Sequence, residues 1–178
     1  MPKRHSHCSS CGKGFSADQA WPRTCAGCGT VCYLNPIPVV VVLLPVHDSV
    51  LLVRRAIEPQ SGLLALPGGY IDHGETWQQA AVREVKEECG VAIRVDELTV
   101  YDVISQPDDL LLIVALSKVR TASGLPRFKP NAEVSELVLA SSPLQLAFPA
   151  HSQALKRYLT SRQGQGQTRV RRRTSQSE

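Results

Sequence analysis

The residues with the clearest chemical potential are three glutamates near the end of one segment, Glu84, Glu87 and Glu88. Residues three and four apart are neighbours on an α-helix, so a helix here would place the three carboxylates within an arc of about 100°. Carboxylates crowded at a helix C-terminus repel one another and the helix dipole. A bound Mg²⁺ or Mn²⁺ would relieve that repulsion and could also bind phosphates. The alternative is a solvated acidic face, which is the usual meaning of a charge run.

The element that would carry these glutamates is a helix from about Trp77 to Cys89. Thr76 and Gln79 fit a capping box at its start, and Gly90 fits the position just past its end, a structural role. Upstream, Gly68 and Gly69 follow a proline at the end of an expected strand, where glycine lets the backbone approach a ligand closely. The sequence therefore predicts a substrate-binding glycine turn that leads into a metal-binding helix.

The same segment matches a known sequence pattern. Residues 69–91 fill every defined position of G-x5-E-x7-R-E-U-x-E-E-x-G-U, where U is aliphatic. The chain thus resembles the Nudix hydrolases over about residues 36–160. The resemblance implies an α/β fold, the Nudix α/β/α sandwich around a mixed sheet. It also implies Mg²⁺- or Mn²⁺-dependent hydrolysis of the pyrophosphate in a nucleoside diphosphate joined to another group.

The resemblance also implies a role for each residue of the pattern. Glu84, Glu87 and Glu88 would bind the catalytic metal ions, and Arg83 would fix the carboxylates by ion pairing. Glu75 would support the loop–helix structure. The backbone of the glycine pair at residues 68–69 would add a carbonyl ligand.

The proton acceptor stays open at this stage. Metal ions lower the pKa of a bound water, and a carboxylate beside them would take its proton. Glu87 and Glu88 are the candidates within the pattern. Some relatives use an acid outside it, and Glu133 or Glu136 would serve in that case.

The N-terminal segment predicts a second metal centre. Cys8, Cys11, Cys25 and Cys28 form two CxxC pairs, each followed by a glycine that lets backbone N–H groups turn toward the thiolates. Four thiolates at this spacing are typical of a structural Zn²⁺ site, the alternative being free thiols on a loop. Cys32 falls outside the pairing and is interpreted as a packing residue.

A zinc ribbon before a Nudix domain looks like two related groups. These are the ADP-ribose/FAD pyrophosphatases and the NADH pyrophosphatases. The run RRAIEPQSGLLALPGG before the box is closest to the first group. Of the SQPWPFPxS array of the second, only Ser105-Gln106-Pro107 is present.

Charge and composition limit which kinds of partner and which cellular location the chain can have. The net charge of +4 comes from five arginines against one acid beyond residue 161, so residues 1–161 sum to zero and present no broad basic surface. No leader or 20-residue apolar run is visible, which predicts a soluble, cytoplasmic protein without a membrane partner. We expect a zinc ribbon over 1–34, a Nudix domain over 35–161 and a disordered basic tail over 162–178.

Periodicity predicts the elements of the central domain. Buried strands are expected at 37–44 and 49–55, further strands near 93–104, 110–118 and 134–140, and a terminal helix over 150–161. Residues 56–68 and 120–131 are expected to be irregular. Arg54 and Arg55 end a strand that leads toward the glutamates. One of them would contact a substrate phosphate, or both would be surface charges.

Three functions follow. The first is hydrolysis of ADP-ribose, FAD or a similar dinucleotide to AMP plus a second phosphate. The second is NADH or NAD-cap pyrophosphatase activity, or RNA association through the ribbon and basic tail. The third is nucleoside-triphosphate house-cleaning. A small nucleotide is the expected partner. The resemblance also implies a homodimer, and the neutral body disfavours nucleic acid without ruling it out.

Overall fold

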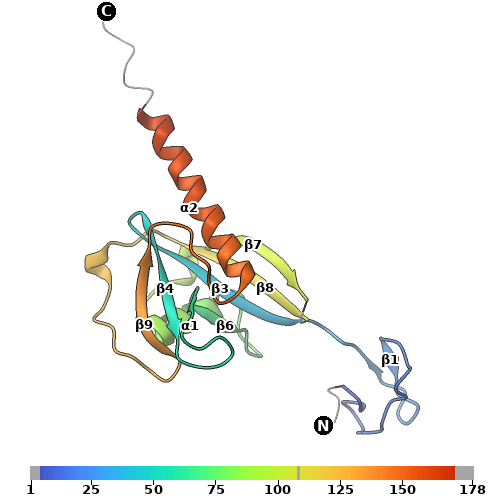
Figure 1. Cartoon of the computed structure of the whole chain (residues 1–178). Coiled ribbons are helices and arrows are strands. Elements are labelled where there is room, and N and C mark those ends of the chain that lie inside the picture. The colour runs from blue at the N-terminus through green and yellow to red at the C-terminus, as the bar shows by residue number, and fades with distance from the viewer. Residues whose placement is uncertain (1–4, 108, 171–178) are drawn as a thin grey trace, which may run out of the picture. The chain divides into compact units, whose positions relative to one another are not determined.

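The computed structural model describes residues 5–107 and 109–170, with backbone alone for 163–170 (Figure 1). The chain divides after Ile37 into two compact units. In the first unit, β1 (Arg23–Thr24) and β2 (Val31–Cys32) pair antiparallel, and the second CxxC pair lies at the turn between them.

The second unit is built on a mixed sheet whose middle strand is β3 (Ile37–Val46). The order across the sheet is β5-β4-β3-β8-β7, while β6 also pairs with β3 and β9 with β4. The other strands are β4 (Ser49–Arg55), β5 (Leu64–Ala65), β6 (Gly68–Tyr70), β7 (Leu98–Gln106), β8 (Leu110–Ser117) and β9 (Val134–Ala140).

The first helix, α1 (Trp77–Cys89), has the predicted bounds. The hydroxyl of Thr76 accepts a hydrogen bond from the Gln79 amide, and the Gln79 side chain accepts one from the Thr76 amide, which completes the capping box. Gly90 ends the helix in the left-handed conformation, with φ 70°, and donates to the Lys86 carbonyl. The helix that carries the glutamates is therefore confirmed together with both of its caps.

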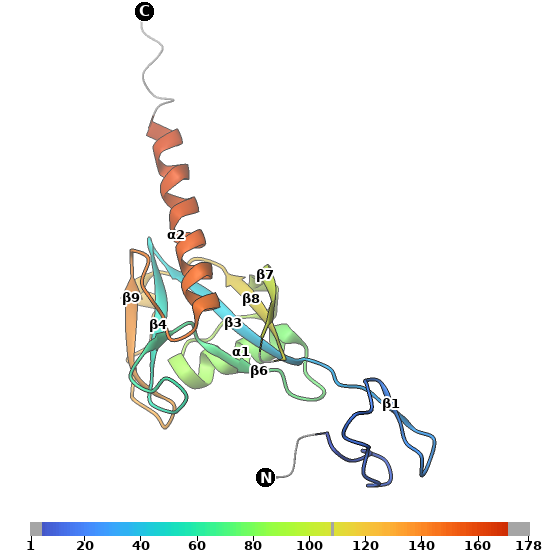
Figure 2. The same ribbon diagram turned by 45° about the vertical axis from the view of Figure 1, so that its right-hand side comes forward.

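Two hydrophobic cores cover the two faces of the sheet, because side chains alternate along a strand. The helices α1 and α2 (Pro149–Val170) lie on opposite faces of the sheet (Figures 1 and 2). Every second residue of β3 from Val40 packs with α1, and the residues between them pack with α2. The first core includes Val40, Val42, Leu44, Ala80, Ala81 and Val85, and the second includes Val41, Leu43, Ala154, Leu155 and Tyr158. The expected α/β/α sandwich is confirmed.

The structure differs from the sequence analysis at several boundaries. The segment 56–68 contains the two-residue strand β5, and β6 starts at its end. The strand expected from 93 begins only at Leu98, because a 3₁₀ turn (Val95–Glu97) precedes it, and a second 3₁₀ turn (Ala122–Gly124) lies in the loop 120–131. Short strands and turns carry too few residues for periodicity to show them.

The terminal helix runs to Val170, whereas disorder is expected from Arg162. Once a packed segment has nucleated a helix, each added residue costs little, and three of the residues from 163 to 170 are Gln, which tolerates a helix, although Gly164 and Gly166 disfavour one. The composition of this stretch indicates correctly that it has few apolar side chains to bury. A segment without a core can still form a helix when it continues one that is already packed. Residues 171–178 of the expected tail lie outside the described residues. No helix in the described part of the chain is both long enough and apolar enough to cross a membrane.

Gly90→Ala should lower the free energy of unfolding by about 1–2 kcal/mol, because left-handed backbone costs a residue with a Cβ atom roughly that much. Denaturant unfolding followed by circular dichroism measures the change. Gly124→Ala is the matched control, since Gly124 does not have a positive φ and an added Cβ would meet only the Thr121 hydroxyl at 3.4 Å. Equal effects of the two substitutions would contradict the assigned cap.

Candidate active site

The site begins where β6 passes beneath the end of α1. β6 pairs antiparallel with β3, so that Gly68 lies opposite Val41 and Gly69 opposite Val40. Gly68 has φ 144°, and a Cβ atom there would come within 2.1 Å of the Val40 carbonyl oxygen. No other residue type fits at this position without moving the central strand.

Gly69 is required for a different reason. A Cβ atom at Gly69 would lie 2.5 Å from the Glu84 Oε1 atom. The missing side chain therefore lets the Glu84 carboxylate lie directly against the backbone of the turn. The neighbouring amide of Gly68 donates a hydrogen bond of 2.8 Å to Glu88 Oε2. The glycine pair thus seats two of the three glutamates.

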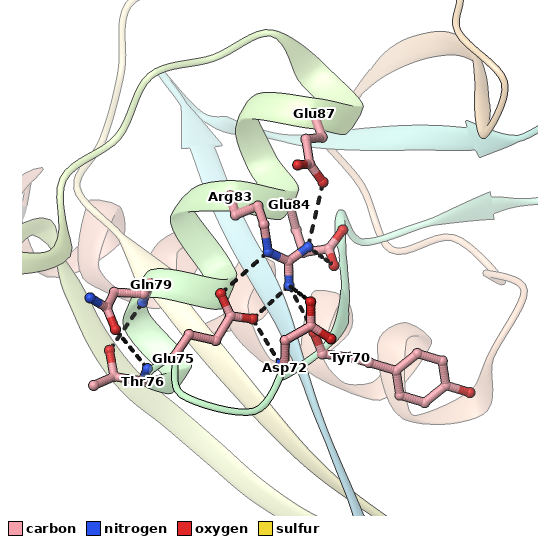
Figure 3. Close-up of polar contacts among 8 residues, drawn as sticks. All are labelled: Tyr70, Asp72, Glu75, Thr76, Gln79, Arg83, Glu84 and Glu87. Carbon is pink, nitrogen blue, oxygen red and sulfur yellow. Dashed lines mark hydrogen bonds and ion pairs between the residues drawn. The ribbon is translucent and has the colours of Figure 1, made fainter.

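Arg83 joins the loop before α1 to the acidic face of the helix (Figure 3). Its Nη2 donates to Glu75 Oε1 at 2.6 Å and to the Tyr70 carbonyl at 3.0 Å. Its Nη1 donates to Glu84 Oε1 at 2.7 Å and more weakly to Glu87 Oε2 at 3.4 Å. One guanidinium therefore fixes the entry loop and two glutamates at once.

Glu75 is the main partner of that guanidinium. It contacts both Nε and Nη2 of Arg83, and Glu75 Oε1 also accepts a hydrogen bond from the Asp72 amide at 2.9 Å. The Arg83 hydrogen bond, with a smaller contribution from the Asp72 amide, holds the pKa of Glu75 below its ordinary value. Glu75 is therefore an anion that braces the loop against the helix.

The three glutamates have different surroundings. Glu84 and Glu88 are buried, with exposed fractions of 9% and 7%, whereas 62% of the Glu87 side chain is exposed. Burial raises the pKa of Glu84, and it raises that of Glu88 to about 8 although the Gly68 amide opposes the shift. Two carboxyls therefore lie where negative charge is poorly compensated.

The free oxygens of these carboxylates suit a cation. Among the described residues, each glutamate has one oxygen with a hydrogen bond from Arg83 or Gly68, and the other oxygen has no such partner. The three carboxylates do not gather as closely as a preformed ligand set. Within the described chain, the four cysteines are the only such group with ligand atoms inside 4.8 Å of one another. Hard, partly desolvated oxygen donors fit Mg²⁺ or Mn²⁺ with water completing its shell.

Glu133 adds a fourth carboxylate, from the loop before β9. Its negative charge makes a small contribution to the raised pKa of both Glu84 and Glu88, so it lies within electrostatic range of them. Asn131 holds this loop, since its amide nitrogen donates to the Glu87 carbonyl at 3.0 Å and its oxygen accepts from the amides of Glu133 and Val134. Sequence reasoning missed Asn131, and no local signal reveals a bond to a residue 44 positions away.

Glu136 and Arg54 are directed to each other. Arg54 Nε donates to Glu136 Oε2 at 2.7 Å across the β4–β9 pair, and Arg54 Nη1 donates to the Gly62 carbonyl. This arrangement occupies both side chains and separates Glu136 from the glutamates of α1, so Glu136 gains no support as the proton acceptor.

Arg55 lies on the site side of the strand. Its positive charge lowers the pKa of Glu88, and its guanidinium lies 5.3 Å from the centroid of the Phe148 ring. Only its Nε is bound within the described chain, to the Pro59 carbonyl. Of the two arginines, Arg55 is thus the one available to a substrate phosphate.

The buried His151 of α2 also supports the glycine turn. Its Nδ1 accepts a hydrogen bond of 3.3 Å from the Leu66 amide, two residues before Gly68. Burial lowers the pKa of His151 to about 4, so the ring is neutral near pH 7. Periodicity could place this residue on α2 but could not show its partner.

The four cysteines of the N-terminal unit form the expected cluster. Their Sγ atoms lie within 4.8 Å of one another. The two CxxC turns are alike, since the Gly12 amide donates to the Cys8 carbonyl and the Gly29 amide to the Cys25 carbonyl, each at 2.9 Å. The Gly27 amide donates to Cys25 Sγ, which is the main cause of the lowered pKa of Cys25. Four sulfur atoms gathered this closely fit a tetrahedral Zn²⁺ ion.

Comparison with known proteins agrees with this geometry. Residues 34–160 match the model of the NUDIX domain. An ADP-ribose pyrophosphatase of Methanocaldococcus jannaschii is 41% identical over 76 residues, 43% of this chain and 44% of that protein. A NAD-capped RNA hydrolase NudC of Salmonella heidelberg is 30% identical over 93 residues, 52% of this chain and 36% of that protein. The chain thus matches less than half the length of these two relatives.

A solved structure matches over a longer range. The crystal structure of a NUDIX hydrolase from Nitrosomonas europaea superposes with a TM-score of 0.67 and 28% identity, covering 89% of this chain and 93% of that one. The glycine turn, the capped acidic helix and the arginine that joins them lie inside the region matched by the NUDIX model. The chain belongs to the Nudix family of hydrolases, which act on pyrophosphate bonds, and carries an N-terminal four-cysteine cluster.

Proposed function

We propose that the protein hydrolyses the pyrophosphate of ADP-ribose, FAD or a similar dinucleotide, giving AMP and a second phosphate. The observation that carries the proposal is the pair of buried glutamates seated on the glycine turn beside Arg83. The similarity to an ADP-ribose pyrophosphatase supports the substrate class.

The proposed metal ligands are Glu84, Glu87 and Glu88, with a backbone carbonyl of the glycine turn. A bound Mg²⁺ or Mn²⁺ would neutralise the pyrophosphate and lower the pKa of a bound water. Arg83 binds one oxygen of Glu84 and one of Glu87, so the other oxygen of each would be free to hold a cation. Arg55 is placed to bind a substrate phosphate from the strand side.

The proton acceptor is one of the two exposed carboxylates near the site. Glu88 is buried and bound to the Gly68 amide, which suits a fixed ligand better than a group that must exchange protons with solvent. Glu87 is mostly exposed, and Glu133 is exposed on a loop held by Asn131. We therefore assign the role to Glu87 or Glu133.

Glu87→Gln should lower kcat for ADP-ribose by about 100-fold or more, because a general base contributes roughly 10²–10⁴-fold and a metal ligand is lost at the same position. Steady-state assays with AMP resolved chromatographically measure this effect. Glu133→Gln tests the other acid, and a larger loss of kcat in that variant than in Glu87→Gln would assign the base to Glu133. Asp96→Asn is the control, since Asp96 is exposed and, among the described residues, forms its ion pair with Arg94. Near-full activity of Glu87→Gln would remove the assigned role.

Metal-free protein should lose stability as the pH rises from about 5 to about 8. The pKa of Glu88 is raised from 4.5 to about 8, so the folded chain keeps a proton that the unfolded chain releases, and folding becomes less favourable through this window. Added Mg²⁺ should therefore raise the melting temperature more at pH 8 than at pH 5. Thermal unfolding with and without Mg²⁺ checks this, and Glu88→Gln should flatten the pH dependence. A Mg²⁺ effect that is the same at both pH values would contradict the assignment.

We propose that the four-cysteine cluster binds one structural Zn²⁺ per chain. Elemental analysis should find close to one zinc in the purified protein, and Cys25→Ser should lose it and melt at a lower temperature. Cys32→Ser is the control, because Cys32 Sγ lies 4.0 Å from Cys8 Sγ but outside the ligand set. Equal zinc loss in both variants would contradict the assigned ligands.

The substrate itself requires a direct screen. ADP-ribose, FAD, NADH, 5′-NAD-capped RNA and nucleoside triphosphates should be compared by kcat/KM in the presence of Mg²⁺. We expect ADP-ribose or FAD to lead. A clear preference for capped RNA or NADH would move the chain to the second function, and a preference for triphosphates to the third.

A further inference from the structure

The N-terminal unit carries an open hollow that the zinc site does not use. Its volume is about 200 Å³, and His5, Phe15, Trp21, Arg23 and Leu34 are among the residues that line it. The aromatic rings meet edge to face, with centroids 6.1 Å apart for Phe15 and Trp21 and 6.2 Å for His5 and Trp21. Phe15 and Trp21 are both only half-buried, so ring surface remains open to a ligand.

Arg23 provides a cation at the same hollow. Its guanidinium carbon lies 4.5 Å from the centroid of the Trp21 ring and 5.6 Å from that of Phe15. Its Nε donates to the Gln19 carbonyl at 2.7 Å. The two terminal nitrogens make no hydrogen bond or ion pair with any other described residue, so they are free to bind an anion.

The net charge of the N-terminal segment, counted from its sequence, favours an anionic occupant. Residues 1–37 contain four Lys or Arg against one acid, while residues 38–161 contain fourteen acids against eleven bases. Four thiolates around Zn²⁺ would carry a formal charge of −2, which has to be set against those cations. The aliphatic part of the Lys13 side chain lies beside Gly27, between the second pair of cysteines. Arg23 remains as the cation at the hollow.

We propose that this hollow binds single-stranded nucleic acid, with one base on the surface of the Trp21 and Phe15 rings that the Arg23 guanidinium leaves open and the adjacent phosphate on Arg23. Stacking on aromatic rings combined with a cation for the backbone is the general way in which single strands are bound without sequence preference. A volume of about 200 Å³ is below the roughly 300–1,000 Å³ of pockets that enclose a whole small ligand, so it suits one flat ring system. This inference does not rest on the proposed hydrolysis.

The first test separates stacking from charge in the full-length chain. Binding of a fluorescein-labelled 12-nucleotide uridine RNA, and of the matching single-stranded DNA, is measured by anisotropy over a series of salt concentrations. Arg23→Gln should reduce the slope of log affinity against log salt by about 0.7, the contribution of one phosphate on a single strand. Trp21→Ala should weaken binding about tenfold at every salt concentration and leave the slope unchanged.

Lys118→Gln is the matched control for charge, because Lys118 is an exposed cation of the other unit. Comparison between variants also cancels any contribution of the arginines beyond residue 161, which all of them share. Equal slopes for Arg23→Gln and Lys118→Gln would overturn the phosphate assignment. The rate of ADP-ribose hydrolysis should be the same in Arg23→Gln and in the unaltered chain. Failure of the nucleic-acid proposal can therefore be told apart from failure of the proposed hydrolysis.

Trp21→Ala could unfold the N-terminal unit, and loss of bound zinc would reveal this. A second measurement tests the proposal without that variant. The chain has two tryptophans, Trp21 and Trp77, so Trp77→Phe leaves Trp21 as the single reporter. RNA or DNA should quench its fluorescence, whereas polyglutamate of equal charge should not. Equal quenching by RNA and DNA would show that the hollow binds a base and phosphate of either nucleic acid. Stronger quenching by RNA would show that it prefers RNA. No quenching by either strand, or equal quenching by polyglutamate, overturns the proposal.

Discussion

The active-site region depends on one guanidinium placed among carboxylates. Arg83 contacts Glu75 in the loop before α1 and Glu84 and Glu87 on the helix itself. Ionised groups of opposite sign within hydrogen-bond distance stabilise one another, and that interaction fixes the direction of each glutamate. Without this cation, the loop would carry an acid facing other acids, and the helix face would carry only like charges.

The glycine turn imposes the second constraint, because it sets how close the backbone comes to the glutamates. Gly68 must lack a side chain to pair with β3, and Gly69 must lack one to admit the Glu84 carboxylate. The result is that Glu84 and Glu88 are buried with limited compensation, and burial raises the pKa of both. Buried charge costs stability, so this arrangement makes physical sense where a cation completes it.

The local parts of this design could be read from the sequence, and the long-range parts could not. The bounds of α1 follow from Thr76, Gln79 and Gly90, because capping bonds join residues that are near in sequence. The strands β3 and β4 follow from their runs of β-branched and aliphatic residues. The pattern of glutamates and Arg83 predicted a common face, and the structure shows contacts among most of its members.

What sequence could not show are contacts set by tertiary packing. Arg54 and Arg55 are adjacent and chemically identical, yet alternation along β4 pairs Arg54 with Glu136 and brings Arg55 to Phe148 and the charge of Glu88. Glu133 and Glu136 are equally ambiguous in sequence, but Glu136 lies opposite Arg54 in the β4–β9 pair, whereas Glu133 lies in the loop before β9. The different surroundings of Arg54 and Arg55 therefore follow from strand alternation, because neighbouring residues of a strand point to opposite faces of the sheet.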